Sequence, residues 1–291
     1  MGMFCTAMPL FATCQPNGLT SRSVIGLAPP NATASVPYSK KATPNILSHL
    51  LNDASLDAPI ISLTLPMWGK EGSSITLGAL PKGYFKVDLS MPLGDLSEGW
   101  DLPLSSVTLA STNDEGDSED VQLDTQGLKF YPSFMSSIRP PHNLTEALYK
   151  HLHALPDSGW GELREFNCSY RGSLPNISFD FDGGDSISFS EPEYTLYGYD
   201  GETLVCLLAI AEFDGPPGTE DVLTIGEELF DKWHVVFDLG IEGKEASMGL
   251  IEREDFEGGE VETGVLTKMQ RDQMVLNTLG KGGKGATVRK G

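Results

Sequence analysis

Basic residues are scarce in this chain of 291 residues, which has 20 lysines and arginines against 41 aspartates and glutamates. The formal net charge is therefore -21 at pH 7. Proteins that bind nucleic acid neutralise phosphates with clustered Lys and Arg, so this composition argues against a nucleic-acid partner. The surplus of negative charge instead indicates a soluble chain whose copies repel one another.

Metal-binding patterns are also missing from the sequence. No pair of cysteines has C-x-x-C spacing and the histidines are scattered, so neither a zinc site nor any other metal site is predicted. The residues concerned are Cys5, Cys14, Cys168, Cys206, His49, His142, His151, His153 and His234. Cys5 and Cys14 could pair across a hairpin or remain buried free thiols, and the sequence leaves both open.

Long hydrophobic runs are missing too. No apolar stretch approaches the ~18 residues that a membrane-spanning helix needs, so no membrane span is predicted. The apolar segment 1–14 has no basic residues at its start and is interrupted by Pro9, so it lacks the pattern of a signal peptide. We interpret the chain as beginning inside a larger ancestral protein.

Glycine and proline are plentiful, at 32 and 19 residues, and helical periodicity is rare. Short apolar or alternating segments between turn residues are typical of β-strands, so a mainly β fold is predicted. The predicted strands include residues 60–65, 74–78, 104–109, 121–123, 174–181, 186–189 and 204–210. Helical spacing appears in residues 44–51 and 142–152.

The second helical segment carries two specific predictions. Asn143 followed by Glu146 resembles a capping box, which predicts that Asn143 caps the helix. An apolar stripe is predicted to face the core, and its members are Ala147, Leu148, His151, Leu152 and Leu155.

Four Asn-x-Ser/Thr sequons are candidates for N-glycosylation, at Asn31, Asn143, Asn167 and Asn176. Each is weak evidence alone, but four of them beside few cysteines indicate a secretory, oxidising compartment. A capping Asn143 could not easily also carry a glycan, so its two predicted roles compete.

One acidic turn stands out in residues 121–132. A short apolar strand ends at Asp124 and Thr125, Gln126 and Gly127 follow, and a second apolar segment closes at Pro132. Asx side chains and glycine both favour tight turns, so this pattern suits a carboxylate held at the end of a strand. By itself, the pattern is more often that of an ordinary turn.

A series of motifs in a fixed order gives this turn its meaning. Val24-Ile25-Gly26-Leu27-Ala28 comes first, and Cys168-Ser169 lies midway. The other members are residues 46–51, 61–65, 75–78, 174–181, 223–230, 233–239 and 248–251. In this order and spacing the chain, roughly from Ser21 to Ile251, resembles the second lobe of the pepsin-like aspartic proteases.

The resemblance implies a fold and a domain layout. The fold would be mainly β, the C-terminal lobe of the pepsin-like acid protease with short helices. Residues 1–20 would be a remnant of the missing first lobe, and residues 21–251 the second-lobe domain. The composition of residues 252–291, acidic and then rich in Gly and Lys, predicts a disordered tail.

The resemblance also implies residue roles. Asp124 occupies the place of the family's second catalytic aspartate, and Cys168 and Cys206 that of its second-lobe disulfide. Proteins or peptides would be the substrates, with no cofactor or metal, in an extracellular, secretory or vacuolar compartment.

The chain departs from the family at the site itself. Gln126 replaces the glycine of Asp-Thr-Gly, Gly127 follows one place later, and neither a first-lobe Asp loop nor a flap tyrosine is evident. We therefore expect an aspartic-protease relative with little or no activity by itself, which associates with itself through an exposed lobe face. The alternatives are a non-enzymatic binder or inhibitor, and an active secreted protease whose gene model is truncated.

Overall fold

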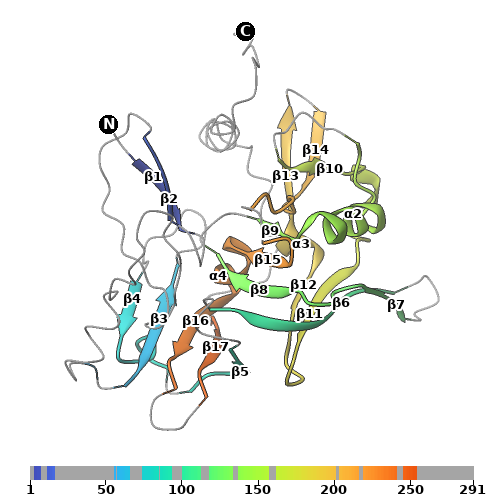
Figure 1. Ribbon diagram of the computed structural model, residues 1–291. Helices are drawn as coiled ribbons and strands as arrows, with labels where there is room; N and C mark the ends of the chain where they lie inside the picture. Colours follow the sequence, from blue (N-terminus) through green and yellow to red (C-terminus); the bar gives the residue numbers. More distant parts are fainter. Residues whose placement is uncertain are drawn as a thin grey trace.

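The computed structural model describes residues 3–7, 12–16, 56, 58–65, 74–84, 86–93, 100–112, 118–133, 137–156, 162–200, 203–215, 219–240 and 245–253. Several predicted features lie outside the described residues: the turn at 24–28, the helix at 44–51, the sequon at Asn31 and most of the tail predicted at 252–291. The first two residues of that tail are described and belong to the fold, since Glu252 ends β17 and Arg253 is buried. The described part consists mainly of strands, with a few short helices (Figure 1). The prediction of a mainly β fold with short helices is therefore confirmed.

A five-stranded antiparallel sheet has the order β4-β3-β16-β17-β5 and lies at the lower left of Figure 1. Its strands are β3 (Ile60–Thr64), β4 (Ser74–Leu77), β5 (Leu89–Pro92), β16 (Trp233–Asp238) and β17 (Ser247–Glu252). Buried Arg253 follows β17 and donates hydrogen bonds to the carbonyl oxygens of Leu65 and Phe230. This sheet thus joins strands from residues 60–92 to strands from residues 233–252.

A seven-stranded sheet has the order β12-β11-β6-β8-β15-β9, with β7 also paired to β6. Its strands are β6 (Leu102–Thr112), β7 (Ser118–Leu123), β8 (Lys129–Pro132), β9 (Ile138–Arg139), β11 (Asn176–Phe181), β12 (Ser186–Phe189) and β15 (Val222–Ile225). Ile177, Phe179 and Phe181 alternate along β11 and are buried, as period-two patterning requires. The predicted hairpin at 174–189 is therefore confirmed as β11 and β12.

A three-stranded sheet, β10-β14-β13, lies at the upper right of Figure 1 beside α2. Its strands are β10 (Arg164–Glu165), β13 (Thr195–Asp200) and β14 (Thr203–Leu208). The helices are α2 (His142–His151), η1 (Cys168–Tyr170), α3 (Glu191–Tyr194) and α4 (Glu227–Lys232). No helix among the described residues is long and apolar enough to cross a membrane.

The N-terminal segment contains a two-stranded hairpin, β1 (Met3–Ala7) and β2 (Ala12–Pro16). The strands are antiparallel, and the backbone register places Cys5 opposite Cys14. The hairpin that a bond between these cysteines would require is therefore present in the backbone.

Helix α2 differs from its prediction at both ends. Its N-cap is Pro141, and no side chain caps the helix, so the prediction that Asn143 is the cap was wrong. Thr145 instead places its hydroxyl 3.0 Å from the carbonyl oxygen of Pro140 and 3.1 Å from that of Pro141. Leu148 and Leu152 are fully buried, but Leu155 lies beyond the helix and is 41% exposed, so the apolar stripe ends before it.

Candidate active-site turn at Asp124

Asp124 lies in the turn that joins β7 to β8, as the sequence predicted. Its side chain is exposed, and the backbone N–H of Gln126 donates a hydrogen bond of 3.1 Å to its Oδ1. This is an Asx turn, in which the carboxylate holds the backbone two residues ahead. The position that the family fills with glycine thus still directs its N–H at the carboxylate, although glutamine occupies it here.

Thr125 anchors the turn to β6. Its side chain is buried, and the Thr125 hydroxyl donates a hydrogen bond of 3.0 Å to the carbonyl oxygen of Ser105. The N–H of Leu104 donates a hydrogen bond of 3.1 Å to the carbonyl oxygen of Leu128. Both sides of the turn are therefore fixed to the same strand, while Asp124, Gln126 and Gly127 are exposed.

The geometry of the turn explains why glycine stands at position 127. The N–H of Leu128 donates a hydrogen bond of 2.9 Å to the carbonyl oxygen of Thr125, which closes a four-residue turn with Gly127 in the third position. The φ angle of Gly127 is +79°, as a type II turn requires at that position. A Cβ atom added to Gly127 would meet nothing within 4 Å, so the backbone angle, rather than space, requires glycine.

We therefore expect Gly127→Ala to lower the free energy of unfolding by about 1 kcal/mol, because an L-residue is strained at positive φ. Gly127→Asn should lower it less, since asparagine tolerates this backbone region better than alanine does. Urea denaturation of the two variants and of Gln126→Ala measures the difference. Equal stability of Gly127→Ala and the unmodified chain would show that the turn does not need a positive φ.

The strand after the turn continues into a parallel pair. β8 lies between β6 and β15, and Leu223 and Thr224 of β15 stand opposite Phe130 and Tyr131 of β8. β15 then pairs antiparallel with β9. The strands β6, β8, β9 and β15, which begin at residues 102, 129, 138 and 222, thus form the sheet next to the Asp124 turn. Of these strands the sequence analysis predicted β6, whereas β9 and the parallel pairing of β8 with β15 were not predicted.

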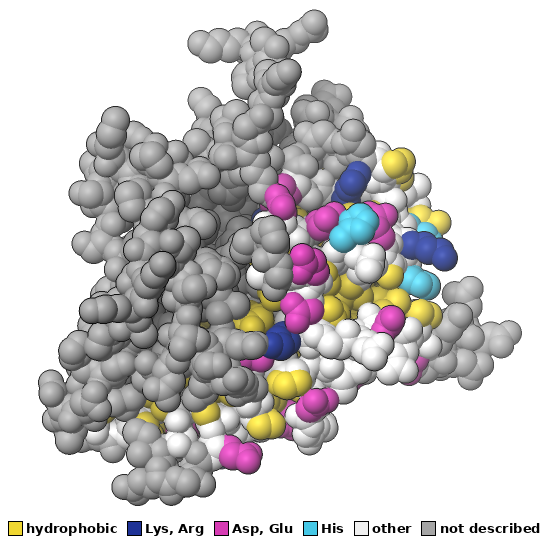
Figure 2. Space-filling model, in the orientation of Figure 1, with side chains coloured by type: hydrophobic (Ala, Val, Ile, Leu, Met, Phe, Trp, Pro, Cys, Tyr) yellow, Lys and Arg dark blue, Asp and Glu magenta, His cyan; other side chains and the backbone are white. Residues whose placement is uncertain are grey.

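Among the described residues, the other Asp-Ser turn belongs to a hairpin of its own. Asp185-Ser186 belongs to the tight turn between β11 and β12, where the N–H of Phe181 donates a hydrogen bond to the carbonyl oxygen of Asp185. Asp157-Ser158 lies outside the described residues. Within the described part, no group of three or more His, Cys, Asp or Glu side chains is placed to hold a metal ion. Figure 2 shows Asp and Glu side chains spread over the described part of one face rather than gathered at one point.

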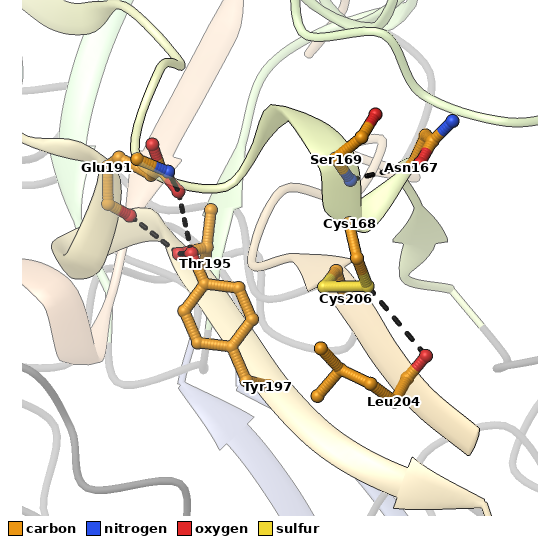
Figure 3. The surroundings of a disulfide bond; sticks show 9 residues. Asn167, Cys168, Ser169, Glu191, Thr195, Tyr197, Leu204 and Cys206 are labelled. Carbon is orange, nitrogen blue, oxygen red and sulfur yellow. Dashed lines mark hydrogen bonds between the residues drawn. A yellow bond between two sulfur atoms is a disulfide. The ribbon is translucent and has the colours of Figure 1, made fainter.

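The disulfide implied by the resemblance is present between Cys168 of η1 and Cys206 of β14, with 5.5 Å between the Cα atoms (Figure 3). The Sγ of Cys168 also lies 3.7 Å from the carbonyl oxygen of Leu204, which is a contact only, because an oxidised sulfur has no proton to donate. Asn167 caps η1, since its Oδ1 accepts a hydrogen bond from the N–H of Ser169.

Glu191 is a buried carboxylate near this disulfide, and the sequence analysis did not predict its role. Glu191 is 6% exposed and accepts hydrogen bonds from the N–H groups of Gly172 and Leu174 and from the hydroxyl of Tyr197. Burial raises the pKa of Tyr197 to about 12, so its hydroxyl keeps the proton that it donates. The structure has a capping box at the start of α3, formed by Ser190 and Glu193. Its Ser-x-x-Glu spacing could have predicted α3 from the sequence, but not the burial of Glu191.

The geometry and the sequence comparisons agree on the class of protein. The family model for eukaryotic aspartyl proteases matches residues 12–247, which is most of the chain, so the chain belongs to that family. A curated relative, Vacuolar protease A of Aspergillus fumigatus, is 25% identical over 195 residues. This match covers 66% of the present chain and 45% of the relative, so the chain spans about half the length of the protein that it resembles.

Proposed function

We propose that Asp124 is the second-lobe carboxylate of an aspartic protease and that this chain by itself does not cleave peptide bonds. The observation that carries the proposal is the turn itself, in which an exposed Asp124 accepts the N–H of Gln126 while Thr125 is buried against β6. This arrangement presents one carboxylate to solvent at the end of a strand.

Peptide hydrolysis by this family requires a pair of carboxylates around one water. One carboxylate takes a proton from the water while the other, protonated, polarises the scissile carbonyl. The two roles separate because like charges at close range cannot both ionise easily. A single Asp124 cannot hold a proton and accept one in the same step, so it supplies half of the required pair.

A second copy could in principle supply the missing carboxylate. Two features oppose this rescue: the bulk of Gln126 at the point of close backbone approach, and the acidic stretch 114–120 just upstream, which would repel its counterpart. Self-association could use another surface, the edge strand β4. Its apolar residues Ile75 and Leu77 have 53% and 37% of their surface exposed. Such association remains a proposal of its own.

The second candidate function is a non-enzymatic binder of peptides or of another protein. It is favoured by the bond from Gln126 to Asp124, because a carboxylate that holds its own turn has a role without catalysis. For either candidate we propose a secretory or vacuolar location, which the disulfide and the name of the fungal relative both support.

Activity at acid pH tests the first candidate. We expect no pepstatin-sensitive cleavage of denatured haemoglobin or casein by the purified chain, because Asp124 supplies only one of the two carboxylates that the reaction requires. The comparison variants are Asp124→Asn and Asp120→Asn; Asp120 is another exposed acid, on β7, and its variant makes the same change in charge.

Pepstatin-sensitive cleavage that Asp124→Asn abolishes and Asp120→Asn retains would overturn the proposal. If that activity rose with the square of protein concentration, the pair would be formed by two copies. Peptide binding without cleavage, measured by calorimetry and unchanged in Asp124→Asn, would favour the binding protein.

A further inference from the structure

Three sequons lie within the described residues, and all three asparagines are exposed. Asn143 is the second residue of α2, Asn167 precedes η1, and Asn176 is the first residue of β11. A glycan is a bulky surface group, so the fold has to leave its asparagine at the surface, and it does so at each of these positions.

The hydroxyl residues of the sequons, in contrast, are engaged by the fold in two of the three cases. The hydroxyl of Thr145 is buried against the carbonyl oxygens of Pro140 and Pro141. The hydroxyl of Ser178 donates a hydrogen bond of 3.0 Å to that of Ser188 on β12. An enzyme that reads both the asparagine and the hydroxyl must therefore act before α2 and the β11–β12 hairpin have formed.

The three sequons differ in how firmly the fold holds them in their native conformation. Isolated helices shorter than about 12 residues and isolated two-stranded hairpins are marginal in water, so α2 and the β11–β12 hairpin open readily until the core has formed. The sequon at Asn167 contains Cys168, and a covalent bond to Cys206 holds its η1 turn. Once that bond has closed, the Asn167 sequon cannot be drawn out as an extended segment.

We propose that Asn143 and Asn176 carry N-linked glycans, while closure of the Cys168–Cys206 disulfide withholds Asn167 from modification. The proposal rests on the secretory or vacuolar route proposed above. Disulfide formation then decides the glycosylation pattern, because only one of the three sequons includes a bonded cysteine.

The test is expression of the full chain behind an added signal peptide in yeast, followed by endoglycosidase digestion and glycopeptide mass mapping. Asn143→Gln and Asn176→Gln should each remove one glycan, and Asn167→Gln should remove none. In a Cys206→Ala background a further glycan should appear, and Asn167→Gln should then abolish it.

A matched pair of variants separates the sequon from the fold. Ser178→Ala and Ser188→Ala both break the hydrogen bond between the two hydroxyls, but only Ser178→Ala destroys a sequon, so only it should lose a glycan. Thr145→Ser keeps the other sequon and should keep its glycan.

Two results would overturn the proposal: a glycan on Asn167 in chains whose disulfide is closed, or unmodified Asn143 and Asn176 in the secreted fusion. If the fusion is glycosylated as expected but the chain without the added signal peptide is not, the proposed route fails and the site assignment stands.

Discussion

Replacing both Cys168 and Cys206 with alanine is expected to lower the free energy of unfolding by roughly 4 kcal/mol. The bond joins residues 38 positions apart, and the chain-entropy model assigns its effect mainly to the unfolded chain, which gains freedom when the loop opens. Because single domains are stable by only about 5–15 kcal/mol, a loss of this size removes a large part of the total.

Urea denaturation measures this loss, and the slope of the transition carries additional information. If the unfolded chain expands when the bond is absent, the slope should rise together with the fall in stability. The control is the Cys5→Ala/Cys14→Ala variant, in which the Cys168–Cys206 pair remains. A change below about 1 kcal/mol in the Cys168/Cys206 variant would contradict the prediction, since it would mean that the unfolded chain is constrained without the bond.

Replacing Glu191 with alanine is expected to lower the free energy of unfolding by about 3 kcal/mol, because buried donors would be left without an acceptor. The N–H of Leu174 is buried, and it would lose the bond to Glu191, as would the hydroxyl of Tyr197. The N–H of Gly172 is less costly to release, because Gly172 is exposed and water can replace the carboxylate there.

Tyr197→Phe is the matched control for this prediction. It removes one hydroxyl donor and leaves the two backbone bonds to Glu191, so it should cost only about 1 kcal/mol. Thermal or urea denaturation of both variants measures the difference. Equal effects of Glu191→Ala and Tyr197→Phe would show that the backbone bonds of the 172–174 segment contribute little.

The disulfide and Glu191 act on one stretch of chain. The disulfide holds Cys168, and Glu191 holds Gly172 and Leu174, so residues 168–174 are fixed at both ends. When one attachment is lost, the segment becomes less ordered and the remaining attachment contributes less to stability. We therefore expect the variant that combines the cysteine and Glu191 replacements to lose less stability than the sum of the two separate losses.

The positions of many strands along the chain could be predicted from the sequence alone. Alternation at 174–181 and at 60–65 predicted β11 and β3, because period-two patterning is a property of neighbouring residues. The turn at Asp124 was predicted for the same reason, since Asp, Thr and Gly act on the backbone within a few positions. Local patterns thus located several of the strands and the turn that holds Asp124, but not β5, β9, β10 or β13.

The tertiary structure alone decided which distant residues meet. No sequence pattern singled out Glu191, yet it is buried and bonded to Tyr197 of β13 and to the backbone of Gly172 and Leu174. Asn143 matched a capping box, but α2 has Pro141 as its N-cap and no capping side chain. Burial and pairing depend on contacts between residues far apart in the chain, whereas a sequence pattern reports only on neighbours.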